Sequence, residues 1–117
     1  MGKVYIVQEP EGKNITSAAK YGEKIIVLLH PGMQIGFSAG QATNVLDRKL
    51  SDFCDDDYLL LLGDPVAIGI AVAVASKWNN GRVKMLKWDR QEAMYYPIAI
   101  NLFEKGERDE SREQFGR

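Results

Sequence analysis

The chain has 117 residues, of which 45% are hydrophobic and 26% charged, values typical of one globular domain. Its formal net charge of -1 argues against a general nucleic-acid binder or anionic-membrane binder, because both depend on clustered positive charge, although a local basic patch stays open. The only cysteine, Cys54, excludes an internal disulfide and a zinc site built from several cysteines. We interpret Cys54 as a small buried hydrophobic residue in a protein of a reducing cytoplasm.

The first half of the chain alternates between predicted strands and helices. A strand is expected at Val4–Gln8, followed by a short helix that begins at an Asn14 N-cap and ends at Gly22. The next strand, Lys24–Leu29, is almost continuously apolar, a pattern typical of a strand that is covered on both faces in a parallel sheet. An amphipathic helix at Gln41–Phe53 completes this half.

The second half continues the alternation and ends in two adjacent strands. The strand Tyr58–Leu62 is another uninterrupted apolar run. A glycine-containing turn then leads into the longest helix, Pro65–Trp78. The strands Arg82–Trp88 and Tyr95–Leu102 are joined by a loop short enough for a hairpin, and Pro97 indicates that the last strand lies at a sheet edge.

This order of elements predicts an α/β fold, a three-layer sandwich around a mostly parallel five-stranded sheet that ends in a β-hairpin. We expect the strand order 2-1-3-4-5, with the fifth strand antiparallel and the second and third strands central and buried on both faces. Residues 1–103 form the single expected domain. Of the fourteen residues 104–117, nine are charged, so this tail is expected to be frayed or disordered.

The turn Gly63-Asp64-Pro65 allows two interpretations. A glycine turn between a strand and a helix is how many α/β proteins present backbone N–H groups to a phosphate. The chain lacks the further glycines of a dinucleotide fingerprint and the Gly-Lys-Ser/Thr of a P-loop, and a carboxylate at Asp64 would compete with an anion. We therefore favour a structural interpretation, in which Asp64 is the N-cap and Pro65 the first residue of the helix.

Other polar residues lie in the predicted turns before and after strands. Asp55-Asp56-Asp57 is interpreted as a solvated turn and not as a cation site. His30 is the only histidine, and no catalytic triad can be assembled around it. Because ligands of open parallel sheets bind beyond the carboxyl ends of the strands, one rim is the best place for a ligand site. The candidate ligand-binding residues of this rim are Glu9, His30, Gly63, Asp64, Asp89 and Arg90.

The helix that begins at Pro65 is apolar on nearly all sides from Val66 to Ala75. A helix on one face of a sheet normally keeps a polar stripe, so either a preceding segment or a second subunit must cover its outer side. We favour the second subunit and expect a homodimer, with Ile68, Ile70, Val72 or Val74 near the shared surface. This apolar stretch is far short of the ~20 residues that span a membrane, and Met1–Tyr5 lacks the apolar run of a signal peptide.

Two runs of the chain, Asp57–Gly69 (DYLLLLGDPVAIG) and Leu86–Gln91 (LKWDRQ), resemble a group of short, uncharacterised proteins of tailed phages and marine viral sequence. The likeness covers about Leu46 to Leu102 and brings no activity that can be transferred. It implies a phage origin and a place in the cytoplasm of the infected host.

These observations lead to two hypotheses of function. The first is a non-enzymatic, phage-type accessory protein that acts through self-association and binding of a partner, with no cofactor. The alternative is a small nucleotide- or phosphate-binding protein or enzyme that uses the rim at the strand ends.

Overall fold

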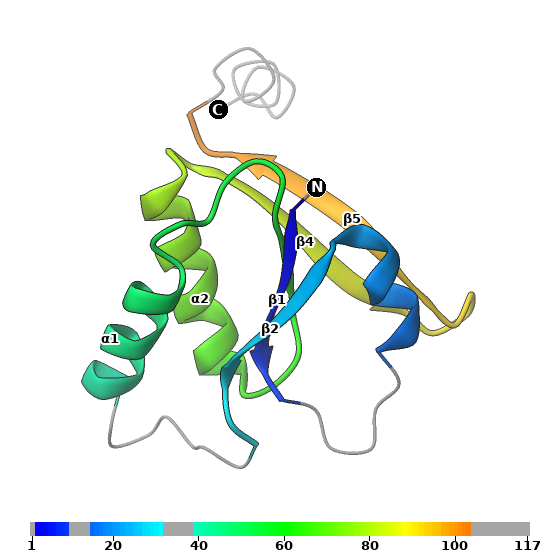
Figure 1. Ribbon diagram of the computed structural model, residues 1–117, viewed down its shortest axis with the longest axis horizontal. Coiled ribbons are helices and arrows are strands. Elements are labelled where there is room, and N and C mark those ends of the chain that lie inside the picture. The colour runs from blue at the N-terminus through cyan, green and yellow to red at the C-terminus, as the bar shows by residue number, and fades with distance from the viewer. Residues whose placement is uncertain (1, 10–14, 32–38, 104–117) are drawn as a thin grey trace, which may run out of the picture.

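A computed structural model of the chain describes residues 2–9, 15–31 and 39–103. These residues form one five-stranded sheet in the order β2-β1-β3-β4-β5 (Figure 1). Strands β1 to β4 are parallel, and β5 pairs with β4 in the antiparallel direction. This confirms the predicted fold class, strand order and terminal hairpin. The strands are β1 (Lys3–Gln8), β2 (Lys24–Leu29), β3 (Tyr58–Leu60), β4 (Arg82–Asp89) and β5 (Met94–Asn101).

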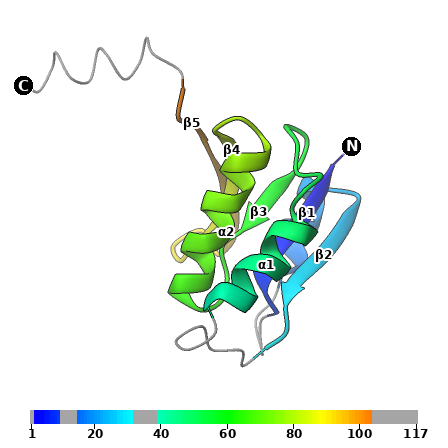
Figure 2. The same ribbon diagram turned by 90° about the vertical axis from the view of Figure 1, so that its left-hand side faces the viewer.

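Helices cover the two faces of the sheet unequally. The α-helices α1 (Ala39–Lys49) and α2 (Pro65–Trp78) lie side by side on one face (Figure 2). The short 3-10 helix η1 (Thr16–Tyr21) packs on the other face, against β1 and β5. The three predicted layers are therefore present, although one of them is a single short helix. None of these helices is long and apolar enough to cross a membrane.

The strand β1 lies within the sheet and is buried from both sides. Tyr5 and Val7 belong to the core under α1 and α2, whereas Val4 and Ile6 belong to the core under η1, and none of the four is more than 2% exposed. This burial explains why a strand in this position has no charged or amide side chain between Val4 and Val7.

The prediction that β2 is a central strand buried on both faces is wrong. β2 lies at the edge of the sheet and pairs only with β1 among the described strands. Leu28 is buried on the side of α1, but Ile25 and Val27, on the side of η1, remain 39% and 36% exposed. A continuous apolar run indicates which faces prefer burial, but it cannot show whether a neighbouring element covers them.

Several element ends differ from the predicted bounds. Helix α1 ends at Lys49 and not at Phe53, because the N–H of Phe53 bonds to the carbonyl of Leu50 in a tighter turn, 2.9 Å away. Leu50 and Phe53 are buried although they lie beyond the helix, which explains why the spacing of apolar residues predicted a longer helix. Strand β3 ends at Leu60, two residues early. The predicted Asn14 cap and the charged tail lie outside the described residues.

The turn between α1 and β3 corrects two further predictions. Asp57 is not solvated: it is 1% exposed, and its carboxylate accepts bonds from the N–H groups of Lys3 (2.8 Å) and Cys54 (3.0 Å). Cys54 is exposed and not a buried hydrophobic residue. Burial is the largest single influence on Lys3 and lowers its pKa, but the Asp57 carboxylate together with Tyr5 and Cys54 outweighs burial, so the pKa of Lys3 lies above its ordinary value.

Candidate functional site

The carboxyl ends of β1, β2 and β3 are joined by one side chain, that of Gln8. Its amide nitrogen Nε2 donates to the carbonyl of His30, 3.2 Å away, and its Oε1 accepts from the N–H of Asp64 at 2.8 Å. Gln8 is 6% exposed, so these bonds satisfy a polar group that would otherwise be costly to bury. Sequence reasoning missed Gln8, although a glutamine at the end of an apolar strand was a usable signal.

The turn from β3 into α2 is built as a helix cap. The backbone of Gly63 has a φ of +119°, and a Cβ at this position would lie 2.4 Å from Cβ of Gln8, so only glycine fits without strain. Oδ1 of Asp64 accepts from the N–H of Val66 at 2.7 Å and of Ala67 at 3.4 Å. The predicted N-cap at Asp64 and the start of the helix at Pro65 are confirmed. The first turn of α2 already has a carboxylate in the place that an anion would take.

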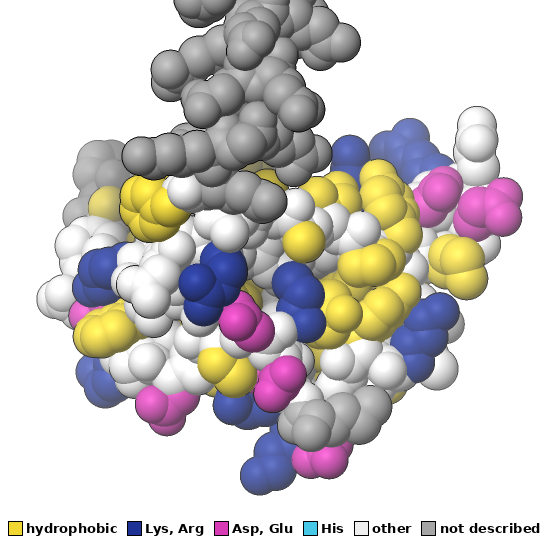
Figure 3. Space-filling view, turned by 90° about the horizontal axis from the view of Figure 1, so that it is seen from above, with side chains coloured by type: hydrophobic (Ala, Val, Ile, Leu, Met, Phe, Trp, Pro, Cys, Tyr) yellow, Lys and Arg dark blue, Asp and Glu magenta, His cyan; other side chains and the backbone are white. Residues whose placement is uncertain are grey.

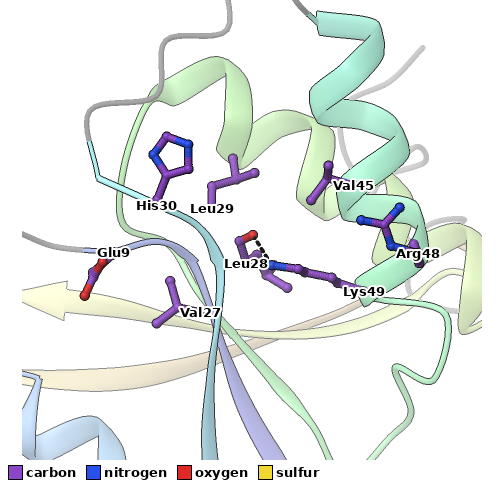
Figure 4. A pocket seen from close by; sticks show the side chains of 8 residues that line it. All are labelled: Glu9, Val27, Leu28, Leu29, His30, Val45, Arg48 and Lys49. Carbon is purple, nitrogen blue, oxygen red and sulfur yellow. Dashed lines mark hydrogen bonds between the residues drawn. The ribbon is translucent and has the colours of Figure 1, made fainter.

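Glu9 and His30, two of the predicted rim residues, line a cleft of about 420 Å³ between β2 and α1 (Figure 4). Sequence reasoning did not name Arg48 and Lys49 of α1, because the spacing of a helix alone does not show which strand end it faces. The Lys49 ammonium donates to the carbonyl of Leu28 at 2.9 Å. The cleft is lined by Glu9, Val27, Leu28, Leu29, His30, Val45, Arg48 and Lys49.

The charges of this cleft are arranged on two sides. Figure 4 shows Lys49 reaching from α1 to β2, Arg48 beside it along α1, and Glu9 across the strand from them. Arg48 forms no ion pair with any residue in the described ranges. The imidazole Nδ1 of His30 lies 3.2 Å from the carbonyl of Pro31. The α1 side of the cleft therefore offers cationic groups next to apolar walls, a lining suited to a ligand with a carboxylate and an apolar part.

Asp89 and Arg90 do not join this group. They lie at the β4–β5 hairpin, whose tip extends to the right of Figure 1, away from the ends of β1 and β2. Oδ1 of Asp89 accepts from the N–H groups of Gln91 (2.9 Å) and Glu92 (3.3 Å), so its carboxylate stabilises the turn. The single predicted rim is thus divided between the ends of β1, β2 and β3 and the separate hairpin.

A second feature that the sequence did not reveal is an aromatic cluster on the side of η1. The rings of Tyr21 and Tyr58 lie 5.1 Å apart, and those of Trp88 and Tyr95 lie 4.9 Å apart. The hydroxyl of Tyr21 donates to the carbonyl of Tyr95 at 3.4 Å and links the two pairs. Burial raises the pKa of Tyr95. Hydrophobic side chains gather on the side of the molecule where η1 and the hairpin lie (Figure 3), and this cluster attaches η1 to the sheet.

The acidic turn before β3 is engaged in structural contacts as well. Oδ1 of Asp55 accepts from Nε of Arg82 at 2.9 Å and from Nδ2 of Asn79 at 2.8 Å, and these bonds hold the pKa of Asp55 below its ordinary value. Within the described parts of the chain, no three His, Cys, Asp or Glu side chains are placed to share a metal ion.

The fold defines a small α/β protein with a mixed sheet, an edge-strand cleft and a capped helix. A family model for phage Pam3 gp32-like proteins matches residues 2–102. The chain belongs to this family, so the resemblance to phage proteins that its motifs indicated is confirmed. Comparison with curated proteins and with solved structures gave no match.

Proposed function

We propose that this phage protein is a non-enzymatic accessory factor that self-associates through the outer face of α2 and acts by binding a partner, in the cytoplasm of the infected host. The supporting observation is the apolar surface that α2 leaves uncovered. Val66 is 57% exposed, and Gly69 and Ala73 on the same side of the helix are exposed as well. Polar side chains begin only at Ser76. In water, such a surface favours association with another apolar surface.

The shape of this face suits close contact with a second helix. A Cβ added at Gly69 would meet no atom within 4 Å, so the space above the helix is open. Gly69 and Ala73 lie four residues apart, on one face of the helix, and their small side chains permit an approaching backbone. Val74, one of the residues that we expected near a shared surface, is 7% exposed and packs within its own chain. The contact is therefore expected at Val66, Gly69 and Ala73.

The apolar surface extends from α2 onto β5. Ile68 and Val72 of α2 and Ile100 of β5 are only partly buried, and all three pack against the same core. Ile98 pairs with Met85 of that core and is 37% exposed. A stable dimer buries upward of ~1,000 Å² in total, so the proposed interface takes in the exposed side of β5 as well as the face of α2.

The alternative function, a nucleotide or phosphate site at the strand ends, is less well supported by the geometry. Asp64 occupies the helix N-terminus, Asp89 bonds within the separate hairpin, and Arg90 follows it there. A thermal-shift panel of nucleotides and divalent metals separates the two hypotheses. A specific ligand at a hundredfold excess over its Kd would stabilise the protein by ~2.7 kcal/mol, whereas the accessory function predicts no shift.

The self-association is tested by replacing each of two alanines with glutamate and measuring the mass by light scattering after size-exclusion chromatography. Ala73→Glu places a carboxylate on the outer face of α2 and should yield a monomer. Ala99→Glu places the same side chain on the opposite face of the sheet, at an exposed position paired with Lys84, and should remain a dimer. An equal mass for both variants would contradict the proposed interface.

A further inference from the structure

The outer edge of β2 presents backbone groups that no described strand pairs with. The carbonyl of Leu29 points inward, because it accepts from the N–H of Glu9 at 2.9 Å. Backbone N–H and C=O groups point to alternate sides along a strand, so Lys24, Ile26 and Leu28 direct theirs toward the open edge. An open edge of this kind is a template for an additional strand.

The side chains along this edge are apolar. Ile25 and Val27 are exposed on one face of the strand, at 39% and 36%. Val45 of α1 and Leu28 line the cleft that accompanies the last part of the edge. An extended segment laid along β2 would therefore bury β-branched side chains as well as form main-chain hydrogen bonds.

The charges beside the edge indicate what the segment must carry. Arg48 and Lys49 of α1 lie next to the last residues of β2, and Lys49 reaches the outward carbonyl of Leu28 (Figure 4). A carbonyl oxygen accepts two hydrogen bonds, so Leu28 can keep Lys49 and still accept from a new strand. Glu9, the one acidic side chain among the described residues that line the cleft, lies across the strand. A carboxylate on the α1 side would meet complementary charge.

A second copy of this chain fits the edge poorly. If two β2 strands paired antiparallel about Ile26, Lys24 of one copy would lie opposite Leu28 of the other. Because the ammonium of Lys49 is bound at the carbonyl of Leu28, Lys24 of each copy would meet Lys49 of the other, and the two positive charges would repel each other. The edge is thus suited to a segment that has an acidic residue where β2 itself has a lysine.

We propose that the open edge of β2 binds an extended segment of another protein, which adds to the sheet as a sixth strand and places a carboxylate against Arg48 and Lys49. This surface is separate from the outer face of α2. Each of the two proposals can therefore be refuted without affecting the other.

The probe is a fluorescein-labelled synthetic heptapeptide of alternating valine and glutamate, compared with its valine–lysine counterpart and with an N-methylated version that cannot pair. Fluorescence anisotropy with the full chain should show binding of the acidic peptide and not of the other two peptides. Salt should weaken this binding. Arg48→Glu should weaken it about tenfold. The control Lys87→Glu changes an exposed lysine of β4 and should have no effect. Circular dichroism verifies that both variants are folded.

Amide hydrogen exchange places the peptide on the molecule. The amides of Ile26 and Leu28 should exchange more slowly with the acidic peptide bound, whereas those of β5 should not change. No binding at about millimolar acidic peptide would overturn the proposal. Equal binding of the lysine or N-methylated peptide would also overturn it. Displacement of the peptide by inorganic phosphate without protection of Ile26 and Leu28 would instead assign the cleft to small anions.

Discussion

Replacing Asp64 tests whether this carboxylate is only a helix cap. Asp64→Ala removes the acceptor for the N–H of Val66, at 2.7 Å, and for that of Ala67, at the longer distance of 3.4 Å. One strong and one weak bond correspond to a loss of about 1 kcal/mol, within the ~0.5–2 kcal/mol range for N-caps. For a domain of this size, the loss should lower Tm by about 4 °C.

Urea unfolding measures this loss as a lower midpoint at an unchanged slope. Asp64→Asn and Asp64→Ser should remain close to wild type, because both side chains can accept the same backbone bonds. The part of the loss that comes from the charge at the positive end of the helix should shrink in high salt. An Asp64→Asn protein of normal stability that no longer self-associates or binds the acidic peptide would refute the cap interpretation.

Three further outcomes follow from the rim and the acidic turn. Gly63→Ala should destabilise the protein by at least about 2 kcal/mol in urea unfolding, because the backbone φ of Gly63 is positive and the new Cβ would collide with Gln8. The control Gly69→Ala places its Cβ in open space and should not destabilise the monomer. Gln8→Leu should cost about 1–3 kcal/mol, because two partly buried backbone groups lose their partner. The hydrogen bond from Arg82 lowers the pKa of Asp55 from its ordinary value of 3.8. The ionised Asp55 carboxylate therefore stabilises the folded protein above pH 3.8, and this stabilisation is lost as the pH falls further. Asp55→Asn should therefore flatten the fall in Tm below about pH 4, and an unchanged profile would contradict this contribution.

The strand order and the helix cap were predictable because each rests on local patterns. Apolar runs separated by helical spacing predict parallel strands joined by crossovers, and Pro97 places the last strand at an edge. The cap at Asp64 follows from its position between a glycine and Pro65. These signals act within a few residues, so tertiary packing left them unchanged.

The edge position of β2, the bridge made by Gln8 and the burial of Asp57 were not predictable in the same way. Each depends on a partner far along the chain: Gln8 bonds to groups 22 and 56 residues away, and Asp57 to the N–H of a residue 54 positions before it. The run of apolar residues in β2 predicted burial on both faces, and the fold leaves one face uncovered. The exposed side chains of that face, Ile25 and Val27, lie along the edge at which we propose that a partner strand adds.

Sedimentation equilibrium of the wild-type protein over about 1–100 μM tests the proposed self-association most directly. If the outer face of α2 binds a second copy, the mass should approach twice the 13.1 kDa of one chain as the concentration rises. A mass of 13.1 kDa throughout this range would show that α2 remains uncovered in solution and would contradict the account.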